Sequence, residues 1–511
     1  MRLFSRALKA GSHAPEIYRM QDRTNSVARQ SPQVLLAANV RLRLFCVALG
    51  LCWAALFPIV GLRYQLQTYG DGSLFTYAIA VQEAWAFHWH NISGRFTVYL
   101  LAHAPAEAYL ALTGNARSAV ALYGLIFFSA PLLGLWATFA LDRSAKRTLF
   151  TFACVSTSAS LPLVFGFPTE MWVAHALFWP TLALALDAND SRRSRFLDTT
   201  LFALLVMSHG GGVLLAFVIL AALALRGFKD VRFVQALKTL GVALVMWAFM
   251  LTTFRPDAYI ADAISGAALN FINIENLIVP ATRVMAVALV VYSLLYLGAR
   301  RMGVRNAHLK TATIVALALI AYWTLFDTSV LTEMRYPLRT AVMALTPALG
   351  LLAAAYVLSE AGSLRLFADL IERGLLLLRR TCHPHFLAGA LMLVTLVHAA
   401  ETAKFTAGWS NYLNSLRNLA MSSASDPQLG NPRFVSATRL GEERNQFAWG
   451  STTHFLSVLV APHMKPERLV VDPDTNYFWL SCPTATANMV APRRVPAESR
   501  QLIRTHACLH R

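Results

Sequence analysis

The feature that most constrains this chain is a succession of apolar segments close to the length that crosses a bilayer. A membrane-spanning helix needs about 20 mainly apolar residues, because the hydrocarbon core is about 30 Å thick. Eleven segments of the 511-residue sequence approach this pattern: 44–62, 117–141, 149–165, 170–187, 196–208, 212–226, 237–253, 278–299, 311–328, 340–358 and 385–402. The sequence therefore predicts an all-α polytopic membrane protein with about eleven transmembrane helices.

The composition supports a membrane environment. Hydrophobic residues make up 56% of the chain and charged residues only 14%, whereas soluble domains are usually about a quarter charged. The net charge of +18 is carried by short Lys and Arg clusters between the apolar segments. Such clusters are typical of membrane topology and disfavour nucleic-acid binding.

The positive charges also predict an orientation. With a cytoplasmic N-terminal tail at 1–43, the inside segments, this tail included, hold 26 Lys and Arg, and the outside segments before residue 400 hold seven. Because cytoplasmic loops are enriched in Lys and Arg, we expect this orientation in a bacterial inner membrane. The domains are then a transmembrane part at 44–402, whose first periplasmic loop is 63–116, and a periplasmic domain at 403–511.

The tail at 403–511 is polar and contains strand-like runs at 455–461 and 468–471. These runs predict a small α+β domain. Cys482 and Cys508 are the tail's two cysteines, and they would form one disulfide if the tail faces an oxidising compartment.

The first periplasmic loop carries the leading catalytic candidate. Asp71-Gly72-Ser73 predicts the start of a helix that runs through about His90, and 97–113 predicts a second helix in the outer interface. A carboxylate at the membrane surface can act as general base on an acceptor hydroxyl. The alternative is that Asp71 only caps the helix. His88-Trp89-His90 predicts an interfacial aromatic anchor rather than a metal site, because the two imidazoles point apart on a helix.

A second acid opens the fourth apolar segment, after almost no loop. Glu170 must therefore lie near the outer boundary, where it could bind an acceptor, a metal or an arginine. The alternative is a carboxylate stabilised by the helix dipole.

Four of the seven arginines on the outer side, where arginine is disfavoured, are candidate ligands: Arg95, Arg255, Arg335 and Arg339. Guanidinium groups bind phosphate well, so these residues are candidates for binding a lipid phosphate or pyrophosphate. The alternatives are ion pairs with acids such as Glu333, or side chains that snorkel to the interface.

His209-Gly210-Gly211-Gly212 separates the two shortest apolar segments, 196–208 and 212–226. These segments are either two tilted spans or one re-entrant hairpin. The motif is similar to the oxyanion-hole sequence of lipases, but the chain has no G-x-S-x-G elbow. The glycines favour a close approach of backbone or lipid, and His209 is a possible ligand contact.

The overall pattern resembles the GT-C superfamily of polyprenyl-phosphate-dependent membrane glycosyltransferases over about residues 41–400. The carriers are Asp71 in a long outer loop, interfacial helices at 73–113, a span that begins at Asn115-Ala116-Arg117, Glu170 after a short turn, and a broken hairpin near His209.

The resemblance implies an inverting transfer of a sugar from a polyprenyl-phosphate donor to an envelope glycan, lipid or protein. It implies Asp71 as catalytic base, Glu170 as secondary acid, and Arg255, Arg335 and Arg339 as phosphate ligands. Many members pair two acids in or near the first loop, and some use a divalent metal. Here the acid after Asp71 is Glu83, about three helical turns away, and with Glu170 it is a candidate acceptor-binding or secondary acid.

Two other functions remain open at this stage. A transporter or flippase would place ionisable residues within the spans, and here these are few, such as Asp198 and Asp327. A glycan polymerase or ligase with a different fold would also use a lipid-linked substrate.

Overall fold

The computed structural model describes residues 40–91, 95–160, 170–187, 191–253, 280–327, 337–381, 383–423, 432–472, 498 and 501–502. Arg255, Arg335, Cys482 and Cys508 lie outside the described residues, as does the predicted disulfide.

The described chain is an all-α membrane protein built on long apolar helices. Six helices contain a stretch long and apolar enough to cross a membrane: α3 (Val40–Arg63), α8 (Ala116–Leu141), α13 (Val231–Thr253), α15 (Pro280–Arg301), α16 (Ala307–Leu325) and α19 (Pro384–Ala420). The other helices of the bundle are α9 (Thr148–Ser160), α10 (Met171–Leu186), α11 (Arg192–Val206), α12 (Gly210–Arg226) and α17 (Pro337–Glu360). Every predicted apolar segment coincides with one of these helices over its described part.

Small residues let the central helices pack closely. A Cβ atom on Gly50 of α3 would lie 2.6 Å from backbone atoms of Cys154 in α9. A Cβ atom on Gly134 of α8 would lie equally close to the backbone of Ala176 in α10. Close contact through small residues is the usual way in which helices associate in lipid, where burying apolar surface adds little.

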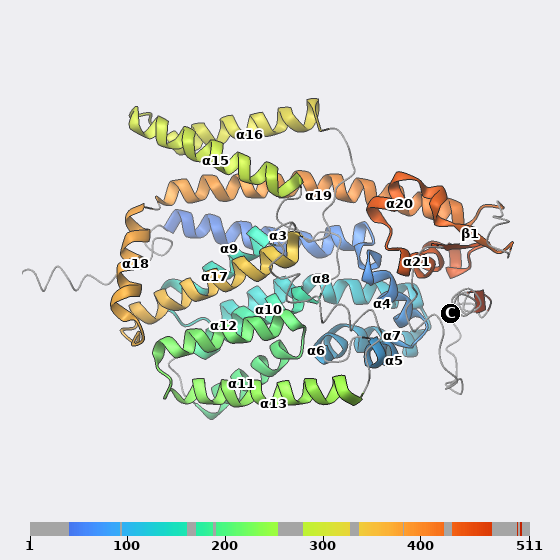
Figure 1. Ribbon diagram of the computed structural model, residues 1–511, viewed down its shortest axis with the longest axis horizontal. Helices are drawn as coiled ribbons and strands as arrows, with labels where there is room; N and C mark the ends of the chain where they lie inside the picture. The colour runs from blue at the N-terminus through green and yellow to red at the C-terminus, as the bar shows by residue number, and fades with distance from the viewer. Residues whose placement is uncertain are drawn as a thin grey trace, which may run out of the picture.

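A second, smaller core joins the hairpin of α15 and α16 to α19, along one side of the bundle (Figure 1). Tyr292 stacks on Phe386, with ring centroids 5.3 Å apart, and its hydroxyl donates to the Phe386 carbonyl at 3.2 Å. Lys404 of α19 pairs with Asp327, just after α16, at 2.5 Å. These contacts attach the hairpin to α19 at more than one level.

The two ends of the bundle differ in structure (Figure 1). At one end α18 (Ala368–Thr381) lies across the ends of the long helices, and we call this the α18 end. The other end, which we call the loop end, carries α4 (Asp71–Ala80), α5 (Ala84–Asn91), α6 (Phe96–Val98), the π-helix η2 (Tyr99–His103) and α7 (Ala104–Thr113).

The C-terminal region also lies at the loop end (Figure 1). It contains η7 (Ala437–Leu440), α20 (Glu442–Phe447), η8 (Gly450–Thr452), α21 (Thr453–Val460) and η9 (Pro462–Met464), with β1 (Phe434–Ser436) pairing parallel to β2 (Leu469–Val471). The predicted strand at 455–461 was wrong, because these residues form α21. One face of α21 packs on α4, where Phe455 contacts Tyr77 at a centroid distance of 4.8 Å.

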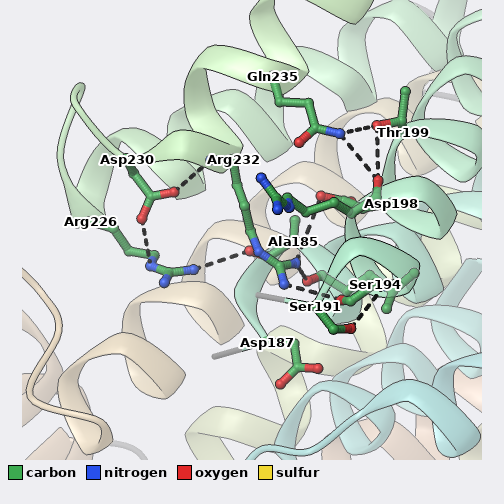
Figure 2. A network of polar contacts seen from close by, with 12 residues as sticks. Ala185, Asp187, Ser191, Ser194, Asp198, Thr199, Arg226, Asp230, Arg232 and Gln235 are labelled. Carbon is green, nitrogen blue, oxygen red and sulfur yellow. Dashed lines mark hydrogen bonds and ion pairs between the residues drawn. The ribbon is translucent and has the colours of Figure 1, made fainter. Parts of the chain in front are cut away.

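An arginine network lies at the α18 end, and Figure 2 shows its contacts. We use this name for Asp198, Arg226, Arg232 and Gln235 with their partners. Arg226 and Arg232 donate to the carbonyls of Ala185 and Leu184 in the last turn of α10. The last carbonyls of a helix have no partner within the helix, so these arginines satisfy them.

The same network joins α11 to α13 (Figure 2). Arg232 donates to the Ser194 hydroxyl at 3.1 Å and lies 3.8 Å from the Asp198 carboxylate, and Gln235 donates to Thr199. Arg232 and Asp198 are both buried. The buried charge at this end is therefore paired.

Candidate functional site

Asp71 lies in the first turn of α4, but it does not cap the helix, contrary to the alternative considered above. The N-cap is Gly70, at φ 57° and ψ −129°, and the cap makes no side-chain hydrogen bond. That conformation is nearly restricted to glycine. The predicted helix through about His90 is also interrupted, because Gln82 adopts φ 57° between α4 and α5.

The start of α4 is held from two sides. The Gly70 carbonyl accepts hydrogen bonds from the Ser73 hydroxyl at 2.8 Å and from the Thr452 hydroxyl of the C-terminal region at 3.4 Å. The residues that follow Asp71 in α4 are all buried, whereas Asp71 itself is partly exposed. Asp71 is thus a partly accessible carboxylate on a fixed helix terminus.

Glu170 and Arg95 form a close ion pair at the loop end. Arg95 Nη1 lies 2.6 Å from Glu170 Oε1, and the Glu170 side chain is 4% exposed while that of Arg95 is 24% exposed. Of the alternatives for these residues, the pairing of Glu170 with an arginine is therefore the one observed. Such a charge-assisted bond satisfies the buried carboxylate.

His209 is the N-cap of α12 and lies near this ion pair. Its Nδ1 accepts a hydrogen bond from the Gly211 N–H at 2.9 Å, and the ring is close enough to Glu170 for their charges to interact. A Cβ atom on Gly212 would lie 2.1 Å from the Leu205 carbonyl oxygen. The glycine run therefore permits a tight turn between α11 and α12, which are two separate helices.

Tyr123 of α8 links the two predicted acids. Its side chain is fully buried, and both Asp71 and Glu170 lie close enough for their charges to act on its hydroxyl. We call Asp71, Arg95, Glu170, His209 and Tyr123, together with Gln67, His88 and His103, the loop-end cluster. Residues from the first loop, the third-to-fourth turn and the α11–α12 turn thus meet in one place.

The aromatic part of the cluster is uncharged. His103 is completely buried, with ring centroids 5.3 Å from Phe75 and 5.3 Å from Tyr123. Burial lowers the pKa of His103 to about 4. Burial, with a smaller contribution from His103, lowers the pKa of His88 to about 3. Both imidazoles are therefore neutral at physiological pH.

Several polar atoms of this part have no hydrogen-bond partner within the described chain. They are both ring nitrogens of His103, the Tyr123 hydroxyl, Gln67 Oε1 and His88 Nδ1. His88 is 1% exposed, so the expectation of an interfacial anchor was wrong for its side chain. An unpaired buried polar group costs free energy. Several such groups in one place therefore require an explanation.

The remaining predicted residues lie elsewhere or are only partly described. Glu83 lies near Glu107 of α7, and their like charges interact. Arg339 lies in the first turn of α17, and the structure describes only its backbone. Within the described ranges, no group of three His, Cys, Asp or Glu residues could hold a metal ion.

Sequence reasoning missed Gln67, His103 and Tyr123 as site residues. His103 is a polar interruption of the apolar stretch 97–113, and this signal could have suggested a role for it. Gln67 and Tyr123 carried no comparable signal, because a single Gln in a loop or Tyr in a span is common.

No protein-family model, curated protein or solved structure matches this chain.

Proposed function

We propose that this chain is an inverting glycosyltransferase that uses a polyprenyl-phosphate sugar donor at the loop end of the bundle. The acceptor is an envelope glycan, lipid or protein. In this proposal the chain crosses a bacterial inner membrane about eleven times, and the α18 end is cytoplasmic, which the excess of Lys and Arg in the loops at that end supports. The loop end and a small α+β C-terminal domain are then periplasmic.

The observation that carries the proposal is the convergence on Tyr123. Asp71 follows the first long helix and Glu170 precedes the fourth helix of the predicted series, yet both carboxyl groups lie near this one buried side chain. Two acids and a guanidinium at the end of an apolar bundle suit a reaction between a membrane-bound donor and a polar acceptor. Intramembrane or interfacial charge is costly and usually marks function.

Asp71 is the general base in this mechanism. The acceptor hydroxyl attacks the anomeric carbon, and Asp71 takes the hydroxyl proton as the new C–O bond forms. The bond between the anomeric carbon and the phosphate oxygen breaks, and polyprenyl phosphate leaves with the electron pair. A single displacement of this kind inverts the anomeric carbon.

The other charged residues have supporting roles. Because Arg95 is held by Glu170 at 2.6 Å, we assign this pair to shaping the acceptor side of the cluster. The donor phosphate is then left to Arg255, Arg335 and Arg339. The proposal requires no metal.

The test is transfer by the full chain in membranes, with Asp71→Asn compared against the native protein. Removal of a general base should lower the rate by about 10²–10⁴-fold, because the amide cannot take the proton. Asp369→Asn is the matched control, since Asp369 is an exposed carboxylate on α18 at the other end of the bundle. The assay uses undecaprenyl-phosphate-linked sugars and isolated envelope as acceptor.

The result supports the proposal if Asp71→Asn abolishes sugar transfer while both variants reach the membrane in equal amounts. Transfer by Asp71→Asn at the native rate would rule out Asp71 as the base.

A further inference from the structure

The loop-end cluster contains unpaired polar groups that the proposed mechanism does not use. His103 leaves both ring nitrogens without a partner in the described chain, and Tyr123 leaves its hydroxyl. Both side chains are completely buried. A fully buried imidazole with no hydrogen bond is unusual, because most buried polar side-chain atoms have a partner in a protein or in ordered water.

These groups lie close together although they come from different elements. The rings of His103 in η2 and Tyr123 in α8 are 5.3 Å apart. Gln67, in the 3-10 helix η1 (Leu66–Thr68), packs against the next residue of α8, because a Cβ atom on Gly124 would lie 3.1 Å from the Gln67 side chain. The Gln67 amide oxygen is the fourth unpaired atom.

The chemistry of these groups indicates an uncharged ligand. A phenol can donate and accept, a neutral imidazole has one donor and one acceptor, and the amide oxygen accepts. Since burial keeps His103 neutral, this part of the cluster offers no positive charge to an anion. The two carboxylates that act on Tyr123 would repel one.

The side chains around these polar groups favour a ligand ring that carries both hydroxyl groups and apolar C–H faces. Phe75 lies 5.3 Å and Tyr99 6.3 Å from His103, measured between ring centroids. Aromatic walls with a few convergent polar groups are typical of small-molecule sites. Asp71 lies one helical turn from Phe75 on α4, so a ligand here would be next to the catalytic base.

We propose that Gln67, His103 and Tyr123 form a subsite that binds the hydroxyl groups of a neutral sugar ring beside Asp71. This inference rests on the proposed function, because it identifies where the transferred sugar or the acceptor sugar is recognised. The subsite binds by hydrogen bonding and aromatic contact, and it takes no part in proton transfer.

The experiment measures binding of methyl glycosides of glucose, galactose, mannose and arabinose to the full chain in lipid nanodiscs by saturation-transfer NMR. At least one glycoside should bind the native protein. Tyr123→Phe removes only the hydroxyl and should weaken binding about tenfold, which is the effect of one lost hydrogen bond of about 1.4 kcal/mol. His103→Phe should weaken binding at least as much.

The matched control is Tyr322→Phe, because Tyr322 of α16 is 39% exposed and lies outside the cluster. It should leave binding unchanged. The thermal unfolding temperature separates binding from stability, since loss of an unpaired buried hydroxyl should not lower it. The inference is overturned if no glycoside binds the native protein, or if Tyr123→Phe binds as tightly as the native protein. In the second case ordered water alone satisfies these groups.

The result of this binding experiment is independent of the transfer assay on Asp71→Asn. If Asp71→Asn abolishes transfer while Tyr123→Phe binds normally, the subsite is wrong and the proposed function stands. If Tyr123→Phe loses binding while Asp71→Asn transfers normally, the subsite stands and the role of Asp71 is wrong.

Discussion

The arginine network and the loop-end cluster lie at opposite ends of the bundle and use their hydrogen-bonding groups differently. In the arginine network of the α18 end, Arg232 bonds to a helix carbonyl and a serine and pairs with Asp198 (Figure 2). No buried side-chain nitrogen or oxygen atom of this network is left without a partner. In the loop-end cluster, His103 and Tyr123 have buried atoms with no partner in the described chain.

This difference distinguishes polar groups that stabilise the fold from polar groups that are available to a ligand. A network whose groups all pair with one another fixes helices and has no capacity left for a ligand. A cluster with unused donors and acceptors is destabilising unless something else binds them. Asp198, the intramembrane acid that a transporter would use, belongs to the first kind, so its presence needs no transport function.

The largest expected effect is at the α18 end. Arg232→Ala should lower the free energy of unfolding by about 3–5 kcal/mol, because it leaves the Asp198 carboxylate buried without its cation. Unfolding in detergent micelles measures the loss. The double variant Asp198→Asn with Arg232→Met should recover part of it, because no buried charge remains.

Arg192→Ala is the control for that comparison, since Arg192 is exposed at the start of α11. It should change stability by less than about 0.5 kcal/mol. Equal losses for the two arginines would mean that the network does not stabilise the bundle.

A smaller effect is expected at the turn that carries His209. Gly212→Ala should cost about 1–3 kcal/mol, because the added methyl group would meet the Leu205 carbonyl oxygen at 2.1 Å and the backbone must shift. The shift should also move His209 relative to Glu170 and lower transfer activity. Gly210→Ala is the matched control, since its Cβ would have no atom within 4 Å. Similar unfolding temperatures for both variants would contradict the close packing.

Much of the fold was predictable because lipid imposes a simple length and composition on each span. Val40–Arg63 and Ala116–Leu141 agree with their predicted segments to within a few residues. The error at Thr453–Val460 has a different origin. Its sequence is rich in residues that favour strands, but the segment is a helix buried among α4, α19 and β2, and tertiary packing can override such a local preference. Such tertiary preferences cannot be read from a local pattern.

The site was predictable only in its charged part. Asp71 and Glu170 stand out because acids are rare near apolar segments, and such acids are costly. The pairing of Arg95 with Glu170 was one of two alternatives. Gln67, His103 and Tyr123 converge only when η1, η2 and α8 are packed. Their significance lies in the lack of partners, which no sequence shows.

The last expected effect, no larger than that at Gly212, concerns Glu107, beside the aromatic part of the loop-end cluster. Burial raises the pKa of this carboxyl to about 7, although it accepts a hydrogen bond from the Ala84 N–H at 2.8 Å. The folded protein therefore binds a proton that the unfolded chain has lost above about pH 4.5. Stability should fall by about 1–3 kcal/mol as pH rises from 4.5 to 7 and then level off, as far as Glu107 determines it. Glu107→Gln keeps an acceptor for Ala84 and should flatten the fall in unfolding temperature over this range. An unchanged slope in the variant would mean that Glu107 is ionised in the folded protein, and the polar groups near His103 would then face a fixed negative charge.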